Sequence, residues 1–138
     1  MRWMGLDIGL RRIGIAISDP LELLAQGHSV LERHKLGHDL DVLSRIIDAE
    51  MVEGIVVGLP KNLNGTEGAM AEKIRVFGEQ LKKKTGMPLV FWDERLSTVA
   101  AERVLLEADL SRKKRKQKID QVAAVLILQN YLDFRKQH

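Results

Sequence analysis

Apolar runs and helical spacings divide the chain into short strands and helices. The first apolar run starts at Trp3 and has Asp7 near its end, and a second run covers residues 13–17. Gly9 lies in the connection between these runs, so the pair predicts a β-hairpin. A weaker third strand is expected at 27–31.

Two further strands are predicted to be buried. Residues 55–60 form a continuous run rich in β-branched side chains, without polar alternation. This pattern is typical of a parallel strand covered on both faces. Residues 89–92 form another buried strand, which Asp93 ends.

Apolar residues at helical spacing predict the helices. A helix over 36–51 would place five apolar side chains on one face: Leu36, Leu40, Leu43, Ile47 and Met51. A second helix carries four such residues and stops before Gly86: Met70, Ile74, Phe77 and Leu81. Ser97 or Thr98 can cap a helix that ends near Ala108. A final, well-buried helix is expected from Ile119 to about Phe134.

The order of these elements predicts the fold class. Three strands, then helix, strand, helix, strand and helices, are typical of an α/β fold with a mixed five-stranded sheet and helices on both faces. The chain has 138 residues, of which 45% are hydrophobic. That is enough for one domain with its own core, so we expect a single domain over residues 1–138.

Composition excludes several classes of site. The chain contains no cysteine, so it has no disulfide framework, no thiol nucleophile and no zinc site built on cysteine, which suits a reducing cytosol. The first residues lack the apolar segment of a secretion signal, and no stretch approaches the length needed to span a bilayer. A soluble, cytoplasmic protein is expected.

Positive charge is concentrated in residues 112–118, the basic segment. Its six cations are Arg112, Lys113, Lys114, Arg115, Lys116 and Lys118. Taking these six charges from the net charge of +3 leaves −3 for the rest of the chain. Such a run predicts a solvated, mobile loop that can meet phosphates.

Three carboxylates are the candidates for catalysis. Asp7 lies where the first strand ends, and Glu94 follows the strand at 89–92. The carboxyl ends of strands in open α/β sheets hold functional residues. Glu94 is preferred to Asp93 because adjacent strand residues point to opposite faces. Asp120 shares a helical face with two alanines that would let the helix approach the sheet closely.

Local roles stay open for two of these residues: Asp7 could cap backbone amides of its turn, and Asp120 could favour a helix N-terminus. Three clustered carboxylates repel one another, so Mg²⁺ or Mn²⁺ ions that neutralise them explain the arrangement best. Two such ions about 4 Å apart would activate water and stabilise the leaving oxygen in phosphodiester cleavage. With the basic segment, the pattern predicts a metal-dependent nuclease.

Four groups of residues resemble the motifs of one known family: Gly5-Leu6-Asp7-Ile8-Gly9 with Arg12-Ile13-Gly14, Val57-Gly58-Leu59-Pro60 with Asn62 and Gly65-Thr66, Asp93-Glu94-Arg95-Leu96-Ser97-Thr98, and Asp120-Gln121-Val122-Ala123-Ala124. In order and spacing the chain resembles the YqgF/RuvX family along nearly its whole length. The resemblance implies a ribonuclease H-like fold and a metal-dependent nuclease, with Asp7, Glu94 and Asp120 as the acidic site.

The same resemblance favours RNA over DNA as the substrate. The family was first likened to the junction resolvase RuvC, and its members are now mostly described as nucleases that mature the 5′ end of the small-subunit ribosomal RNA precursor. It therefore implies a role on pre-16S ribosomal RNA.

Candidate contacts to nucleic acid outside the basic segment are Arg11, Arg12, Lys61, Asn62 and Arg95. The two hairpin arginines lie beside Asp7, although a solvated turn would also carry them. Arg95 either contacts a phosphate or pairs with Asp93 to orient its loop. The other two open a loop rich in turn residues.

Two residue pairs are assigned to structure rather than chemistry. His34 and His38 have the helical spacing of a metal-binding pair, but the sequence shows no third ligand, so surface histidines are expected. Trp3 and Trp92 lie in predicted strands and are expected to fill the core, because base stacking requires exposed rings.

Three other functions compete with the RNA nuclease. A Holliday junction resolvase would act on DNA and favour a dimer with two sites. A non-catalytic ribosome assembly factor would hold RNA through the basic segment. An actin-like ATPase shares the Asp-Ile-Gly turn but needs two such domains. Monomer and homodimer both stay open, and ribosomal particles are candidate partners.

Overall fold

The predicted hairpin lies at the centre of the sheet. The computed structural model describes residues 1–96 and 112–137, with side chains described for 1–96 and 121–137. Strand β1 (Arg2–Ile8) pairs antiparallel with β2 (Arg12–Ser18), and β2 pairs antiparallel with β3 (Ala25–Glu32). The turn between β1 and β2 is closed by the Gly9 N–H, which donates to the Arg12 carbonyl at 2.8 Å.

The other two strands run parallel to β1, as predicted from their unbroken apolar runs. Strand β4 (Val52–Leu59) pairs with β1, and β5 (Leu89–Asp93) pairs with β4. The strand order is β3-β2-β1-β4-β5, so the mixed five-stranded sheet is confirmed. Because β1, β4 and β5 are parallel, their carboxyl ends lie at one edge of the sheet.

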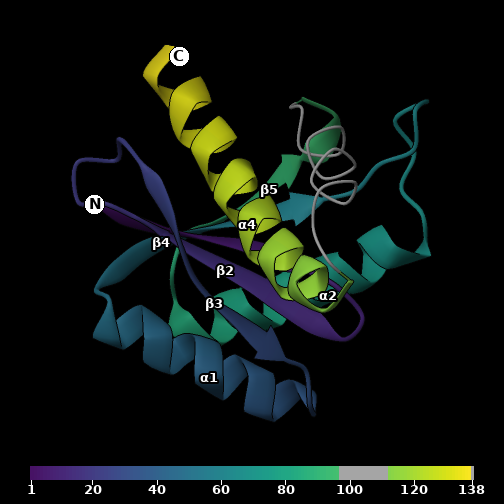
Figure 1. Cartoon of the computed structure of the whole chain (residues 1–138), viewed down its shortest axis with the longest axis horizontal. Helices are drawn as coiled ribbons and strands as arrows, with labels where there is room; N and C mark the ends of the chain where they lie inside the picture. Colours follow the sequence, from purple (N-terminus) through teal and green to yellow (C-terminus); the bar gives the residue numbers. More distant parts are fainter. Residues whose placement is uncertain (97–111, 138) are drawn as a thin grey trace.

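Helices cover both faces of this sheet, as predicted (Figure 1). Helix α4 (Arg112–Gln137) crosses one face, where it covers Trp3, Val56 and Trp92. Helices α1 (Leu36–Ala49) and α2 (Ala69–Thr85) pack on the other face, over a larger core that includes Met4 and Leu6. The sheet therefore separates two apolar layers.

The predicted apolar stripe of α1 is correct in its middle and wrong at both ends. Leu40, Leu43 and Ile47 are buried, whereas Leu36 is exposed and Met51 is 77% exposed. The helix ends at Ala49, and Met51 has a left-handed φ of 55° in the turn that leads to β4. Its side chain therefore leaves the helical face that the spacing alone assigns to it.

Helix α2 ends where the sequence predicts. Gly86 adopts a left-handed φ of 69°, and its N–H donates to the Lys82 carbonyl. Glycine reaches this conformation without the penalty of a Cβ, which is why it so often ends a helix. The predicted inward residues Ile74, Phe77 and Leu81 are buried.

The basic segment is helical, and its prediction as a loop was wrong. Helix α4 begins at Arg112 rather than Ile119, and it continues past Phe134 to Gln137. Lysine and arginine are good helix formers, and the segment contains no glycine or proline. Repulsion between like charges on one helix face costs only a few tenths of a kcal/mol per pair, about 0.2–0.5.

Two further sequence predictions concern the helix after Ser97 and the lack of a membrane-spanning stretch. The helix expected from Ser97 or Thr98 to about Ala108 lies outside the described residues. Within the described residues, no helix combines the length and apolar character needed to cross a membrane.

Helix α4 lies against the sheet at very short distance. A Cβ built on Gly5 of β1 would lie 2.7 Å from the Leu128 Cβ and 3.0 Å from the Ala124 carbonyl oxygen. Ala123 and Ala124 are buried at this contact. The sequence prediction that small residues bring this helix close to the sheet is confirmed.

Candidate active site

Asp7 and Glu94 both lie at the carboxyl-end edge of the sheet. Alternation along β1 places Asp7 on the same face as Trp3 and Gly5, which is the face that α4 covers. Asp7 is half-buried there. Glu94 begins the short 3₁₀ helix η1 (Glu94–Leu96) directly after β5.

Gly58 of β4 lies between the two carboxylates. It pairs with Trp92 in β5, and it follows Val57, which is level with Leu6 of β1. A Cβ built on Gly58 would lie 3.2 Å from Glu94 Oε1 and 2.5 Å from Ile127 Cδ1 of α4. The glutamate therefore reaches over Gly58 on the α4 face, which is also the face of Asp7.

Gly58 shapes the candidate site, although the sequence analysis named it only as part of the family motif Val57-Gly58-Leu59-Pro60 and gave it no role. Its lack of a side chain makes room for the Glu94 carboxylate and the Ile127 side chain. The available signal was a lone glycine inside a β-branched run, because glycine in a strand interior marks a close approach of other groups.

The third predicted carboxylate, Asp120, belongs to α4. It precedes Ala124 by one helical turn, and the carbonyl of Ala124 lies against Gly5. Its side chain lies outside the described part of the structure, so its place in the acidic site stays a prediction.

Strand alternation turns Asp93 away from the α4 face, because Asp93 is the last residue of β5 and follows Trp92, which packs under α4. Glu94 is already in the 3₁₀ helix, so alternation does not fix the direction of its side chain. Asp93 instead pairs with Arg95: Arg95 Nη2 donates to Asp93 Oδ2 at 2.8 Å, and the Arg95 backbone N–H donates to Oδ1 at 2.9 Å. Lys61 Nζ lies 4.0 Å from the same carboxylate.

This ion pair also connects the end of β5 to the loop that follows β4. Arg95 Nη1 donates to the Leu63 carbonyl at 3.3 Å, and Lys61 Nζ lies 3.9 Å from Glu67 Oε2. The side chain of Asn62 donates to Thr66 Oγ1 at 2.9 Å. Lys61, Asn62 and Arg95 therefore order this loop, and their contact with nucleic acid stays a prediction.

Arg95 lowers the pKa of Asp93 below its ordinary value of 3.8, mainly through the side-chain hydrogen bonds. A carboxylate with a lowered pKa in the folded state contributes stability above pH 3.8, and this contribution is lost as the pH falls through the folded-state pKa. We expect Arg95→Gln to raise the pKa of Asp93 toward 3.8. An NMR titration of the side-chain carboxyl carbons would measure this shift.

Asp41 provides the internal control for that titration, because its pKa is lowered by Lys84 rather than by Arg95. Its titration should be the same in wild type and Arg95→Gln. An unchanged Asp93 titration in the variant would show that this ion pair does not persist in solution.

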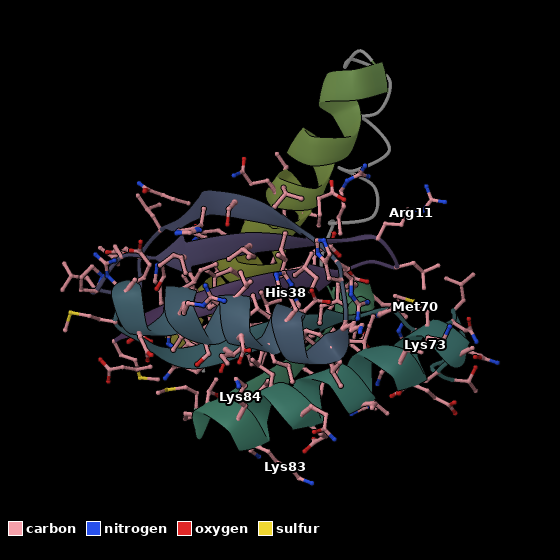
Figure 2. All side chains as sticks on the ribbon, turned by 90° about the horizontal axis from the view of Figure 1, so that it is seen from below. Arg11, His38, Met70, Lys73, Lys83 and Lys84 are labelled. Atoms are coloured by element: carbon pink, nitrogen blue, oxygen red, sulfur yellow. The ribbon has the colours of Figure 1, made fainter. Side chains whose placement is uncertain are left out.

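The hairpin arginines have different surroundings. Arg11 is exposed at the turn, where Figure 2 shows it at the outer end of the hairpin. Arg12 Nε lies 2.9 Å from Glu32 Oε1 of the neighbouring strand β3. Arg11 is thus the more accessible of the two, and phosphate binding by either stays a prediction.

The two tryptophans fill the core, as predicted. Trp3 is 4% exposed and Trp92 is 6% exposed, and both pack edge-on against Tyr131 of α4. Neither ring is available for stacking on a base.

The sequence matches one protein family over nearly its whole length. The family described as "RuvX: Holliday junction resolvase" matches residues 1–134. A protein of Moorella thermoacetica named "Putative pre-16S rRNA nuclease" is 55% identical over 133 residues, which are 96% of this chain and 95% of that relative. A protein of the same name from Carboxydothermus hydrogenoformans is 49% identical over 138 residues, with 100% of both chains covered.

Solved structures with this fold include junction resolvases. The structure "T. thermophilus RuvC in complex with Holliday junction substrate" matches with a TM-score of 0.67 at 15% identity, covering 99% of this chain and 96% of that one. The fowlpox virus Holliday junction resolvase matches with a TM-score of 0.54 at 13% identity, covering 97% and 99%. At these identities the likeness shows the fold alone, and it confirms the predicted ribonuclease H-like class.

Proposed function

The chain belongs to the RuvX family and is a nuclease that hydrolyses phosphodiester bonds, and we propose that it matures the 5′ end of pre-16S ribosomal RNA. The observation that carries this proposal is the identity, over almost the whole chain, to relatives that are named for this RNA. This role would place the protein in the cytoplasm with ribosomal precursor particles.

We assign catalysis to Asp7, Glu94 and Asp120 in one nuclease domain over residues 1–138. Two observations support the assignment: Asp7 lies on the α4 face of β1, and Glu94 extends over Gly58 on that same face. Asp120 belongs to the helix that packs against this region. Carboxylates supplied by two strand ends and one helix would surround a single scissile phosphate.

These residues fit hard divalent cations. Oxygen donors on separate elements suit Mg²⁺ or Mn²⁺, and the missing side chain of Gly58 lets the Glu94 carboxylate approach β4 on the face that also carries Asp7. A bound divalent ion would supply positive charge that polarises the phosphate and makes a coordinated water more acidic. Asp7, Glu94 and Asp120 would hold the ions and orient the attacked phosphodiester.

The basic segment is the surface that we propose binds the RNA backbone. Its residues form the first turns of α4, and Figure 2 shows this end of the helix projecting beyond the sheet, away from α1 and α2. Six cations on a projecting helix would attract a polyanion, with an affinity that falls as salt rises. The exposed Arg11 would add a further contact beside Asp7.

Holliday junction cleavage is the second candidate, because the family description names that activity. Both candidates use the same phosphodiester chemistry, so the acidic site alone does not separate them. A junction resolvase would act as a homodimer on a symmetric DNA substrate, whereas the RNA nuclease we propose does not need two sites.

Cleavage of three substrates tests the proposal: pre-16S ribosomal RNA in precursor particles, an unrelated single-stranded RNA of equal length, and a four-way DNA junction. We expect cleavage of the precursor RNA with Mg²⁺ or Mn²⁺, and none after chelation with EDTA. Cleavage confined to the junction would replace RNA by DNA as the substrate. Tight RNA binding without cleavage of any substrate would favour the assembly-factor function instead.

A further inference from the structure

His34 and His38 lie side by side at the junction between β3 and α1. His34 precedes the helix by two residues and His38 is in its first turn, and their ring centroids are 4.7 Å apart. Both side chains are exposed. Figure 2 shows His38 on α1, the helix that covers one face of the sheet together with α2. Asp7 and Glu94 lie on the opposite face, which α4 covers.

The structure adds Asp39 to the two histidines as a third candidate ligand, which the spacing in the sequence did not indicate. It follows His38 directly, and its side chain is 0% exposed. Asp39 Oδ1 accepts a hydrogen bond from the His34 backbone N–H at 2.9 Å. Asp39 Oδ2 is buried and accepts no hydrogen bond from any described residue, although Arg33 Nε lies 3.5 Å away. The Arg33 guanidinium is therefore the cation beside this buried oxygen, and Oδ1, the oxygen that faces the two histidine residues, is the candidate metal ligand.

The orientation of the imidazoles suits a metal ion. His34 Nδ1 lies 3.0 Å from the Glu32 carbonyl oxygen. A ring N–H that donates to a carbonyl fixes the tautomer and leaves the lone pair on Nε2, which is the usual arrangement in metal-binding histidines. His38 Nδ1 lies 3.4 Å from Asp39 Oδ1. Two ligands bound at roughly 2.0–2.1 Å to a tetrahedral ion are separated by about this distance, 3.4 Å.

We propose that His34, His38 and Asp39 form a second metal site, for an ion of the Zn²⁺ class. One ligand atom from each residue lies within 4.8 Å of the others. Imidazole nitrogen suits Zn²⁺, Co²⁺ and Ni²⁺, whereas Mg²⁺ prefers oxygen ligands alone. Three protein ligands leave one tetrahedral position for water. This site does not depend on the proposed nuclease function.

Arg33 links this site to the hairpin that carries Asp7. Its Nη1 donates to the Gly9 carbonyl at 2.9 Å, and its backbone N–H donates to the Arg11 carbonyl at 2.8 Å. A cation bound to Asp39 would share that carboxylate with the Arg33 guanidinium. The metal ion would therefore bind next to the positive charge of Arg33. Repulsion between these two cations would lower the affinity of the site for the metal.

Titration of tag-free protein with Co²⁺ tests the proposal, because tetrahedral Co²⁺ has visible d–d absorption bands. Excess Mg²⁺ in the buffer would occupy the acidic site. We expect one equivalent of Co²⁺ to give tetrahedral bands that Zn²⁺ abolishes, both in wild type and in Asp7→Asn. His34→Gln and His38→Gln should each weaken binding by about tenfold or more. Because both rings are exposed, circular dichroism should show the variants folded.

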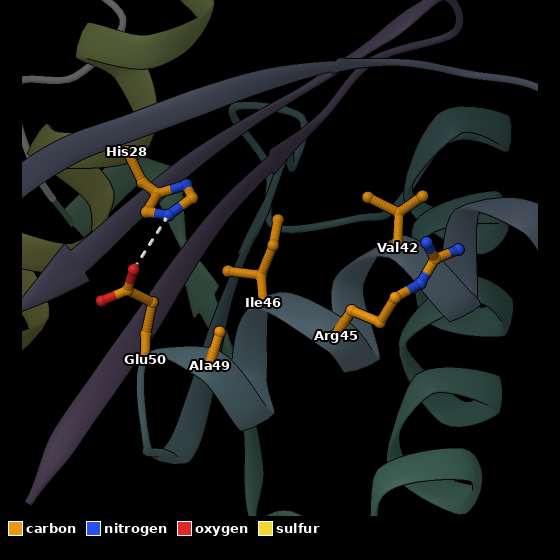
Figure 3. A pocket seen from close by; sticks show the side chains of 6 residues that line it. All are labelled: His28, Val42, Arg45, Ile46, Ala49 and Glu50. Carbon is orange, nitrogen blue, oxygen red and sulfur yellow. Dashed lines mark ion pairs between the residues drawn. The ribbon is translucent and has the colours of Figure 1, made fainter.

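His28→Gln is the matched control. Its Nε2 lies 3.4 Å from Glu50 Oε1 at the other end of α1, in a shallow pocket formed with Val42, Ile46 and Ala49 (Figure 3). This variant should bind Co²⁺ as tightly as wild type. Failure of the wild type to bind, or equal affinity in His38→Gln and wild type, would overturn the proposed site. Loss of binding in Asp7→Asn would also overturn it, by assigning the bound ion to the acidic site.

Discussion

Replacing Asp7 with asparagine is expected to lower the rate of RNA cleavage by about 10²–10³-fold or more. Asparagine has almost the same shape but carries no charge, so it should preserve β1 while removing one proposed metal ligand and one negative charge beside Gly58. Asp7 is only half-buried, which lets the amide remain hydrated. Single-turnover cleavage of the precursor RNA, with enzyme in excess, measures this loss without a contribution from product release.

Asp48→Asn is the control for this experiment. It makes the same chemical change on the exposed side of α1, on the opposite face of the sheet. Its cleavage rate should equal that of wild type, and both variants should unfold at the same urea concentration as wild type. A wild-type rate in Asp7→Asn would remove this residue from the proposed mechanism.

Replacing Gly5 with alanine is expected to destabilise the fold by about 1–3 kcal/mol. The added Cβ would lie 2.7 Å from the Leu128 Cβ and 3.0 Å from the Ala124 carbonyl oxygen, and neither is the flexible end of a side chain. Helix α4 would have to move away from the sheet. Urea denaturation followed by circular dichroism gives the change in free energy of unfolding.

Gly37→Ala is the matched control, because no described atom lies within 4 Å of the Cβ it would add. Gly37 is inside α1, so alanine there should leave stability unchanged or raise it by up to about 1 kcal/mol. Equal unfolding free energies for Gly5→Ala and wild type would show that α4 adapts without cost.

The sheet was predictable because its patterns are local and strong. A glycine between two apolar runs indicates a hairpin, and the unbroken run ending at Leu59 indicates a strand covered on both faces. Parallel strands also bring their carboxyl ends to one edge, which is why Asp7 and Glu94 could be paired before their positions were known.

The errors came from patterns that compete with one another. Charge alone assigned the basic segment to a loop, but the high helix propensity of lysine and arginine extends α4 through it. Helical spacing assigned Met51 to the core, but the helix ends two residues earlier. In the first case helix propensity outweighed charge, and in the second the end of the helix outweighed helical spacing.

Residues that depend on tertiary contacts were the hardest to find. Gly58 matters because Ile127 and Glu94 approach it from other elements. Asp39 is an ordinary acidic residue in the sequence, and only the fold shows that it is fully buried beside His34 and His38. Sequence spacing detects neighbours on one helix or strand, whereas these contacts join several elements.

The two apolar layers separated by the sheet are covered in different ways, and this affects how the protein opens. Helices α1 and α2 share one face and contact each other, whereas α4 packs on the other face against β1, β2, β3 and β4. Because α4 contacts four of the five strands, its detachment would expose that whole layer, so we expect it to cost nearly as much free energy as global unfolding. Amide protons in the buried part of α4 would then exchange with solvent together with those of β1 and β4. Since the proposed site takes Asp120 from α4 and the other two carboxylates from the sheet, the site should stay assembled until the whole domain unfolds.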